Sequence, residues 1–120
     1  MGMDFTITKL IEPGLSGERV WKEERLLYMR KPYHLADCCY AVALGLDYDD
    51  GIAEAVSKFG PFPFTEDMMI EVLLLALEIE KTKKVQWCYD GDSRRGEFIQ
   101  AWEKIIGNMD YGDWVLIEWI

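Results

Sequence analysis

The stretch TEDMMIEVLLLALEIEKTKK, residues 65–84, is the longest apolar run of the chain and has clear signals at both ends. Thr65 suits the capping position of a helix, two acidic residues follow in the first turn, and three lysines lie near the other end. Asp67, Glu71 and Glu78 fall at i, i+4 and i+11, which places them on one narrow stripe of a helix. The stretch therefore predicts a central helix that is exposed along this stripe and packed against neighbours elsewhere.

The rest of the chain predicts an α+β fold with one helix-rich domain over residues 1–120 and a sheet of about three strands around helix 65–84. Residues 61–64 predict an extended connector because they hold two prolines. If the last two strands are neighbours, the helix between them makes a right-handed parallel crossover. We expect strands at residues 4–12, 85–89 and 113–120, and helices at 16–28, 32–44, 52–59 and 94–107, although residues 25–29 also fit a strand.

The composition bounds the function. The 120-residue chain has a net charge of −9, which argues against direct binding to nucleic acid or to an anionic membrane. Its three cysteines form no CxxC motif and it has one histidine, so we expect neither a disulfide framework nor a metal site, and no cofactor. No secretion signal or membrane span is recognisable, so we expect a cytoplasmic protein. The start MGMDFT fits the loose N-myristoylation pattern, but we do not expect lipidation.

The negative charge is concentrated in the middle of the chain. Residues 37–80 hold one basic and ten acidic side chains, and no lysine or arginine lies between Lys31 and Lys58. Such carboxylates can simply cap helices and keep an apolar segment soluble. They can also form a surface that docks on a basic protein and makes that association sensitive to salt. The residues predicted to bind such a partner are Asp37, Asp47, Asp49, Asp50, Glu54, Asp67 and Glu71.

Catalytic or metal chemistry has weaker support. His34 and Cys38 are spaced i, i+4 on one predicted helix, but a cysteine in an apolar helix is usually a core residue. Asp47, Asp49 and Asp50 suggest a calcium loop, but Leu46 stands where an EF-hand needs its first ligand.

Two features near the end of the chain have both a structural and a functional interpretation. The turn from Gly91 to Gly96, GDSRRG, has two arginines before a predicted helix and could hold a phosphate, but it lacks the P-loop pattern. Trp114 and Trp119 should mostly be core residues, although on a terminal strand they could form a homodimer interface or the wall of a pocket.

The sequence favours a small, acidic, non-enzymatic binding protein or inhibitor whose partner is a basic protein, such as a nuclease or another nucleic-acid-binding protein. In size and charge alone the chain is similar to phage anti-defence (anti-CRISPR-like) inhibitors and to bacterial immunity proteins. The alternative is a small enzyme or ligand-binding domain with its site at the Gly91–Gly96 turn or around His34 and Cys38.

Overall fold

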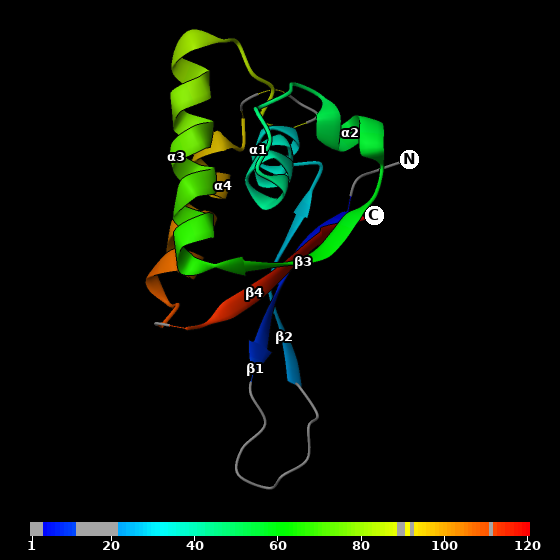
Figure 1. Ribbon diagram of the computed structural model, residues 1–120. Helices are drawn as coiled ribbons and strands as arrows, with labels where there is room; N and C mark the ends of the chain where they lie inside the picture. The colour runs from blue at the N-terminus through cyan, green and yellow to red at the C-terminus, as the bar shows by residue number, and fades with distance from the viewer. Residues whose placement is uncertain (1–3, 12–21, 89–90, 92, 111) are drawn as a thin grey trace, which may run out of the picture.

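The computed structural model confirms the α+β class, with four helices and one four-stranded sheet in its described part. It describes residues 4–11, 22–88, 91, 93–110 and 112–120, and the helices gather on one side of the sheet (Figure 1). The myristoylation pattern at Met1 and Gly2 lies outside the described residues. In chain order the elements are β1 (Asp4–Ile11), β2 (Lys22–Arg30), α1 (Tyr33–Leu44), α2 (Ile52–Val56), β3 (Phe59–Thr65), α3 (Glu66–Thr82), α4 (Arg95–Gly107) and β4 (Trp114–Trp119).

The sheet has the strand order β2-β1-β4-β3, and every neighbouring pair is antiparallel. The parallel crossover that the sequence allowed for, if the strands at 85–89 and 113–120 were neighbours, does not arise, because residues 85–88 form no strand. β4 lies between β1 and β3, so both of its backbone edges are already paired. A dimer formed by pairing the edge of this strand is excluded, because edge pairing needs unused backbone donors and acceptors.

The predicted helix at 16–28 is wrong where the structure describes it, because residues 22–30 form strand β2. Residues 16–21 lie outside the described residues. β2 pairs with β1 over its whole length, with one register shift after Ile7. Leu27 and Met29 face the core while Tyr28, between them, is half exposed, which is the two-residue period of a strand. Pairing with β1 outweighs the helix-forming tendency of the charged residues that begin the segment.

The extended connector is confirmed, and it is also the edge strand β3, which the sequence did not predict. Pro61 and Pro63 are tolerated there because a strand at the edge of a sheet needs fewer backbone donors. The short helix before it ends at Val56 rather than Phe59. Gly60 has a positive φ of 85°, and a Cβ atom at this position would lie 2.4 Å from the backbone oxygen of Ile117. Only glycine fits between these two strands.

The strand predicted at residues 85–89 is absent from its described part, residues 85–88, and Tyr89 lies outside the described residues. Cys88 makes only an isolated backbone bridge to Gly91. Trp87 is instead fully buried beneath the helices. The apolar and aromatic content of this segment therefore reflects burial of a turn and not sheet pairing.

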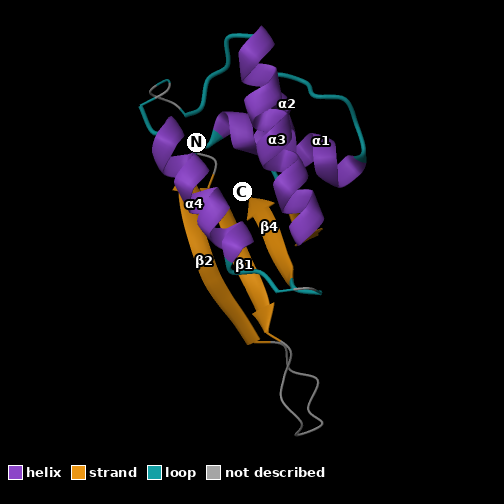
Figure 2. Cartoon of the chain, turned by 90° about the vertical axis from the view of Figure 1, so that its left-hand side faces the viewer, coloured by secondary structure: helices purple, strands orange, loops and turns teal. Residues whose placement is uncertain are grey.

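The core lies between the sheet and the helices, and Figure 2 shows α4 crossing the strands on this covered side. Phe5 of β1 stacks on Trp119 of β4 with ring centroids 6.0 Å apart and contacts Trp102 of α4 at 6.3 Å. The buried residues of β4 alternate with partly exposed ones, and Trp114 is 48% exposed. Trp119 is a core residue, and Trp114 lies on the uncovered face of the sheet.

The helix at 65–84 is confirmed, with Thr65 accepting a hydrogen bond from the backbone N–H of Met68 at 3.3 Å. The predicted solvent stripe is also confirmed, since Asp67, Glu71 and Glu78 are all exposed. Leu74, at i+7 from Asp67, lies on this same stripe and is 62% exposed, whereas the residues between Met68 and Glu80 that lie off the stripe are buried or half-buried. α3 is therefore covered on most sides, as predicted, but it is one of several helices on the sheet and not a single central element.

Candidate functional site

The predicted acidic residues that lie together on the surface are those of the α1–α2 loop and of α2. α1 ends at Gly45, whose left-handed conformation lets the backbone N–H of Leu46 bond to the oxygen of Ala41 at 2.9 Å. Leu44 and Leu46 are 41% and 55% exposed. The acidic loop surface, as we define it, consists of two exposed leucines and four exposed carboxylates: Leu44, Leu46, Asp47, Asp49, Asp50 and Glu54.

Asp37 does not belong to this surface, which corrects the prediction that it binds a partner. Its side chain is 2% exposed and accepts hydrogen bonds from the backbone N–H groups of Gly51 at 3.0 Å and Ala53 at 2.8 Å. Burial raises the pKa of Asp37 to about 6, although these two N–H donors act to lower it. Asp37 therefore caps the start of α2 from within α1 and holds the acidic loop surface in place.

Tyr48 is a second anchor of the same loop. Its hydroxyl lies 3.3 Å from Nδ1 of His34 and 3.5 Å from a carboxylate oxygen of Asp50. Lys83 Nζ, at the end of α3, lies 5.6 Å from the centroid of the Tyr48 ring. Burial, followed by the nearby charge of Asp37, raises the pKa of Tyr48, so the side chain stays a neutral phenol. The loop is thus tied to both α1 and α3, and Lys83 bounds its negative surface on one side.

Asp67 and Glu71 are exposed, but they lie on α3 away from the acidic loop surface. The seven residues of β3 separate α2 from α3, and an extended strand of this length spans roughly 20 Å. Figure 1 shows α2 and the start of α3 on opposite sides of the domain. The predicted acidic residues therefore form two surfaces and not one.

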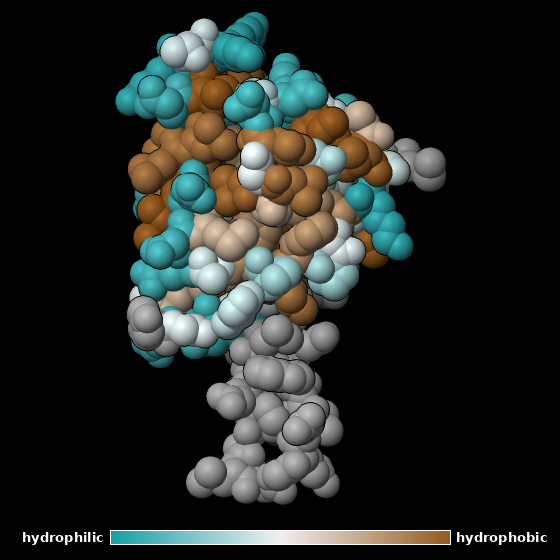
Figure 3. All heavy atoms as spheres, viewed as in Figure 1, coloured by the Kyte–Doolittle hydropathy of each residue, from teal (hydrophilic) through white to brown (hydrophobic). Residues whose placement is uncertain are grey.

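Both of these regions display apolar side chains at the surface. Along α3, Figure 3 shows hydrophobic surface interrupted by hydrophilic side chains, and the leucines there include the exposed Leu74. Around α2 the hydrophobic surface is bordered by hydrophilic atoms on several sides. An exposed apolar contact with a charged rim is the usual layout of a protein interface, and both regions have it. The acidic loop surface is the stronger candidate because it holds four carboxylates and two exposed leucines within residues 44–54.

The alternative site around His34 and Cys38 is buried. His34 is 1% exposed, and because a carbonyl can only accept, its Nε2 donates to the oxygen of Ala76 at 2.8 Å. Cys38 is fully buried, and burial raises the pKa of its thiol, so little of the reactive thiolate forms. Within the described ranges no group of three or more metal-binding side chains is present. The spacing of these two residues reflects core packing.

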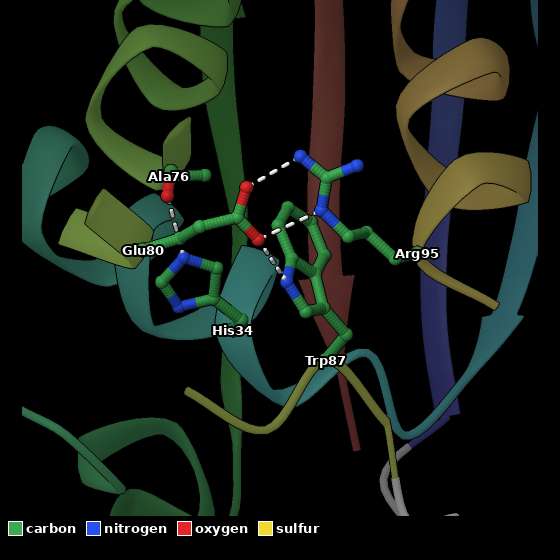
Figure 4. A network of polar contacts seen from close by, with 5 residues as sticks. All are labelled: His34, Ala76, Glu80, Trp87 and Arg95. Carbon is green, nitrogen blue, oxygen red and sulfur yellow. Dashed lines mark hydrogen bonds and ion pairs between the residues drawn. The ribbon is translucent and has the colours of Figure 1, made fainter. Parts of the chain in front are cut away.

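The Gly91–Gly96 turn is tied to the same core by a network that the sequence did not reveal (Figure 4). Arg95 donates two hydrogen bonds to the carboxylate of Glu80, which also accepts from Trp87 Nε1 at 2.8 Å. The Trp87 ring packs edge-on against His34 with centroids 4.7 Å apart. The Arg95 hydrogen bonds, followed by the Trp87 bond, lower the pKa of Glu80. Arg95, one of the two arginines that could have held a phosphate, is therefore already paired with Glu80. Asp92, also in this turn, lies outside the described residues.

Comparisons with protein-family models, curated proteins and solved structures find no match to this chain. Within its described residues, none of the helices is both long and apolar enough to cross a membrane. A function has to be inferred from the residues of the chain itself.

Proposed function

We propose that this protein is a non-enzymatic cytoplasmic binding protein or inhibitor that docks its acidic loop surface on a basic surface of a partner protein, one that itself binds nucleic acid. The observation that carries the proposal is the clamp at Asp37. A buried carboxylate that holds two backbone N–H groups fixes the loop between α1 and α2, which displays Leu46 and three aspartates. Loops fixed in this way lose less conformational entropy on binding.

The charge of the surface supports the same proposal. Its four carboxylates come from a span of eight residues, and the nearest basic residues in the sequence are Lys31 and Lys58. A concentrated negative surface speeds encounter with a positive partner and is screened by salt. Leu44 and Leu46 would supply the apolar contact that charge alone does not give. The surface thus combines steering and anchoring groups.

The test begins with capture of partners from cell extract on the immobilised protein, with salt titrated from low to high concentration. A supporting result needs more than capture: a basic protein must be bound, released by salt, and displaced by a DNA oligonucleotide that competes for its basic surface. Its affinity is then measured with the purified partner and a loop-reversal variant in which Asp47, Asp49, Asp50 and Glu54 are changed to lysine.

The loop-reversal variant should bind the partner at least about a hundredfold more weakly, because attraction becomes repulsion. The matched control reverses the acidic stripe of α3, with Asp67, Glu71 and Glu78 changed to lysine, and should bind within a few-fold of the native protein. A milder variant changes only Asp47 and Glu54 to lysine. In the described structure neither side chain caps a helix or makes a hydrogen bond that holds the loop. Unchanged affinity in both loop variants, or an equal loss in the α3 control, would refute the proposed surface.

A further inference from the structure

A hollow lies between α4 and the first two strands, where Figure 2 shows α4 alongside β1 and β2. Leu26 and Leu27 of β2 form one wall, and Ala101 and Ile105 of α4 form the other. Met109, just after α4, closes its end. The cavity has a volume of about 360 Å³ and is open to solvent.

The surface of this hollow is mainly apolar. Ile105 and Met109 are 7% and 8% exposed, so they line its inner part, while Leu26, 36% exposed, lies nearer the rim. Since a water molecule occupies about 30 Å³ in the liquid, the cavity has room for roughly twelve non-hydrogen atoms. A volume of this size lies in the range of small-molecule sites, and it is too small for a lipid with two acyl chains.

Among the side chains that the structure describes, the charged ones that line the hollow are Lys9 from β1 and Lys104 from α4. Lys9 is held by an ion pair in which its Nζ lies 3.4 Å from a carboxylate oxygen of Asp113. Lys104 is exposed, and its backbone oxygen accepts a hydrogen bond from the Asn108 side chain at 2.8 Å. In a chain of net charge −9, two lysines beside an apolar hollow are a local exception. At physiological salt such near charges matter more than distant ones, because the Debye length is about 8 Å.

We propose that this hollow binds a single-chain carboxylate amphiphile of about ten carbons. The chain lies over Ile105 and Met109, and the carboxylate lies against Lys104, beside the ion pair of Lys9 with Asp113. The apolar wall supplies burial and the ammonium group of Lys104 selects the anionic head, which is the division of roles common in ligand sites. The site is separate from the acidic loop surface and does not depend on its function.

The probe is sodium decanoate, kept below the concentration at which it forms micelles, with binding followed by calorimetry and by amide NMR shifts. Decanoate should shift the amides of residues 101–109 and of Leu26 and Leu27 in a saturable way. Decanol, which has the same chain without the charge, should bind at least about tenfold more weakly, and decyltrimethylammonium should not compete. Equal binding of all three probes, or no saturable shifts with decanoate, would overturn the proposal.

Variants separate charge from cavity shape. Lys104→Glu should weaken decanoate binding at least about tenfold, whereas Lys81→Glu should leave it unchanged. Lys81 is the matched control because it is also an exposed lysine in the last turn of its helix, on α3. Ala101→Phe places a ring in the hollow and should abolish binding while the melting temperature shows that the domain is folded. Native affinity in both Lys104→Glu and Ala101→Phe would place decanoate elsewhere and refute the assignment.

Discussion

Asp37→Asn tests the clamp beneath the acidic loop surface. The asparagine oxygen can still accept from the Ala53 N–H, but its NH₂ group faces the Gly51 N–H, so one hydrogen bond to a charged acceptor is lost. Such a bond contributes about 1.5 to 3 kcal/mol, partly offset because no charge is buried in the variant. We therefore expect Asp37→Asn to lower the free energy of unfolding by about 1 to 2 kcal/mol near pH 7.5, where the carboxylate of the native protein is ionised.

The pH dependence of this difference identifies the cause. The pKa of Asp37 is raised from 3.8 to about 6 on folding, so the folded protein binds this proton more tightly than the unfolded chain. The stability linked to this proton is fully present below pH 3.8 and is lost as the pH rises through 6. Between pH 5 and 7.5 the native protein should lose roughly 1.5 kcal/mol relative to Asp37→Asn, which has no such titration.

Urea denaturation of both proteins at half-unit steps from pH 5 to 7.5 measures this difference directly. Groups that titrate in both proteins, such as Glu80, cancel when the two free energies of unfolding are subtracted at each pH. A difference that stays constant with pH would refute the raised pKa. A difference that grows in favour of the native protein would show that the two N–H donors stabilise the ionised carboxylate more than burial destabilises it.

Three further predictions follow from the described contacts. Gly60→Ala should lower the free energy of unfolding, measured in urea, by about 2 to 4 kcal/mol, because the new Cβ would meet the backbone oxygen of Ile117. The control is Gly96→Ala on α4, where the new Cβ meets no other atom, and it should raise the free energy of unfolding by up to about 1 kcal/mol. Glu80→Gln breaks the ion pair with Arg95 and should cost about 1 kcal/mol at pH 7; since the pKa of Glu80 is lowered on folding, this loss should shrink as the pH falls through the acidic range. The three cysteines are buried, so a thiol reagent such as DTNB should label fewer than one thiol in the folded protein at pH 8 and all three in urea.

The parts of the fold that the sequence predicted well are those in which the local signals agree. Gly45 ends α1 where expected, and the last helix, α4, also forms as predicted. The helix predicted at 16–28 was wrong in its described part because its charged residues favour a helix only locally. In the assembled sheet, backbone pairing with β1 outweighs that local preference. β3 was read as a connector because prolines rarely occur within sheets, and only its edge position makes it a strand.

The candidate site shows the same limit at the level of single residues. The four loop carboxylates were predicted as exposed, and the structure places them at the surface. Asp37 was grouped with them from its charge, although some of these carboxylates were also expected to cap helices. In the structure Gly51 occupies the N-cap position of α2, and the side chain of Asp37, from α1, accepts the hydrogen bonds of the first turn. One signal pointed this way, since Asp37 stands between apolar residues in a helix that is otherwise nearly all apolar, and a buried acidic residue always needs partners.

The division of the acidic residues into two surfaces has a physical origin in how helical periodicity works. The positions of Asp67, Glu71 and Glu78 show that they share one face of α3, and that face is exposed. Periodicity orders side chains around the axis of a helix, but it does not say in which direction that axis runs through the fold. The direction of α3 is set by β3, which pairs with β4 and carries the chain away from α2 before the helix begins. The pairing of β3 with β4 joins segments far apart in the sequence, so it leaves no local sequence pattern. For that reason the sequence grouped the acidic residues of α3 with those of the loop. Because β3 separates the two surfaces, a partner can bind the acidic loop surface without contacting α3.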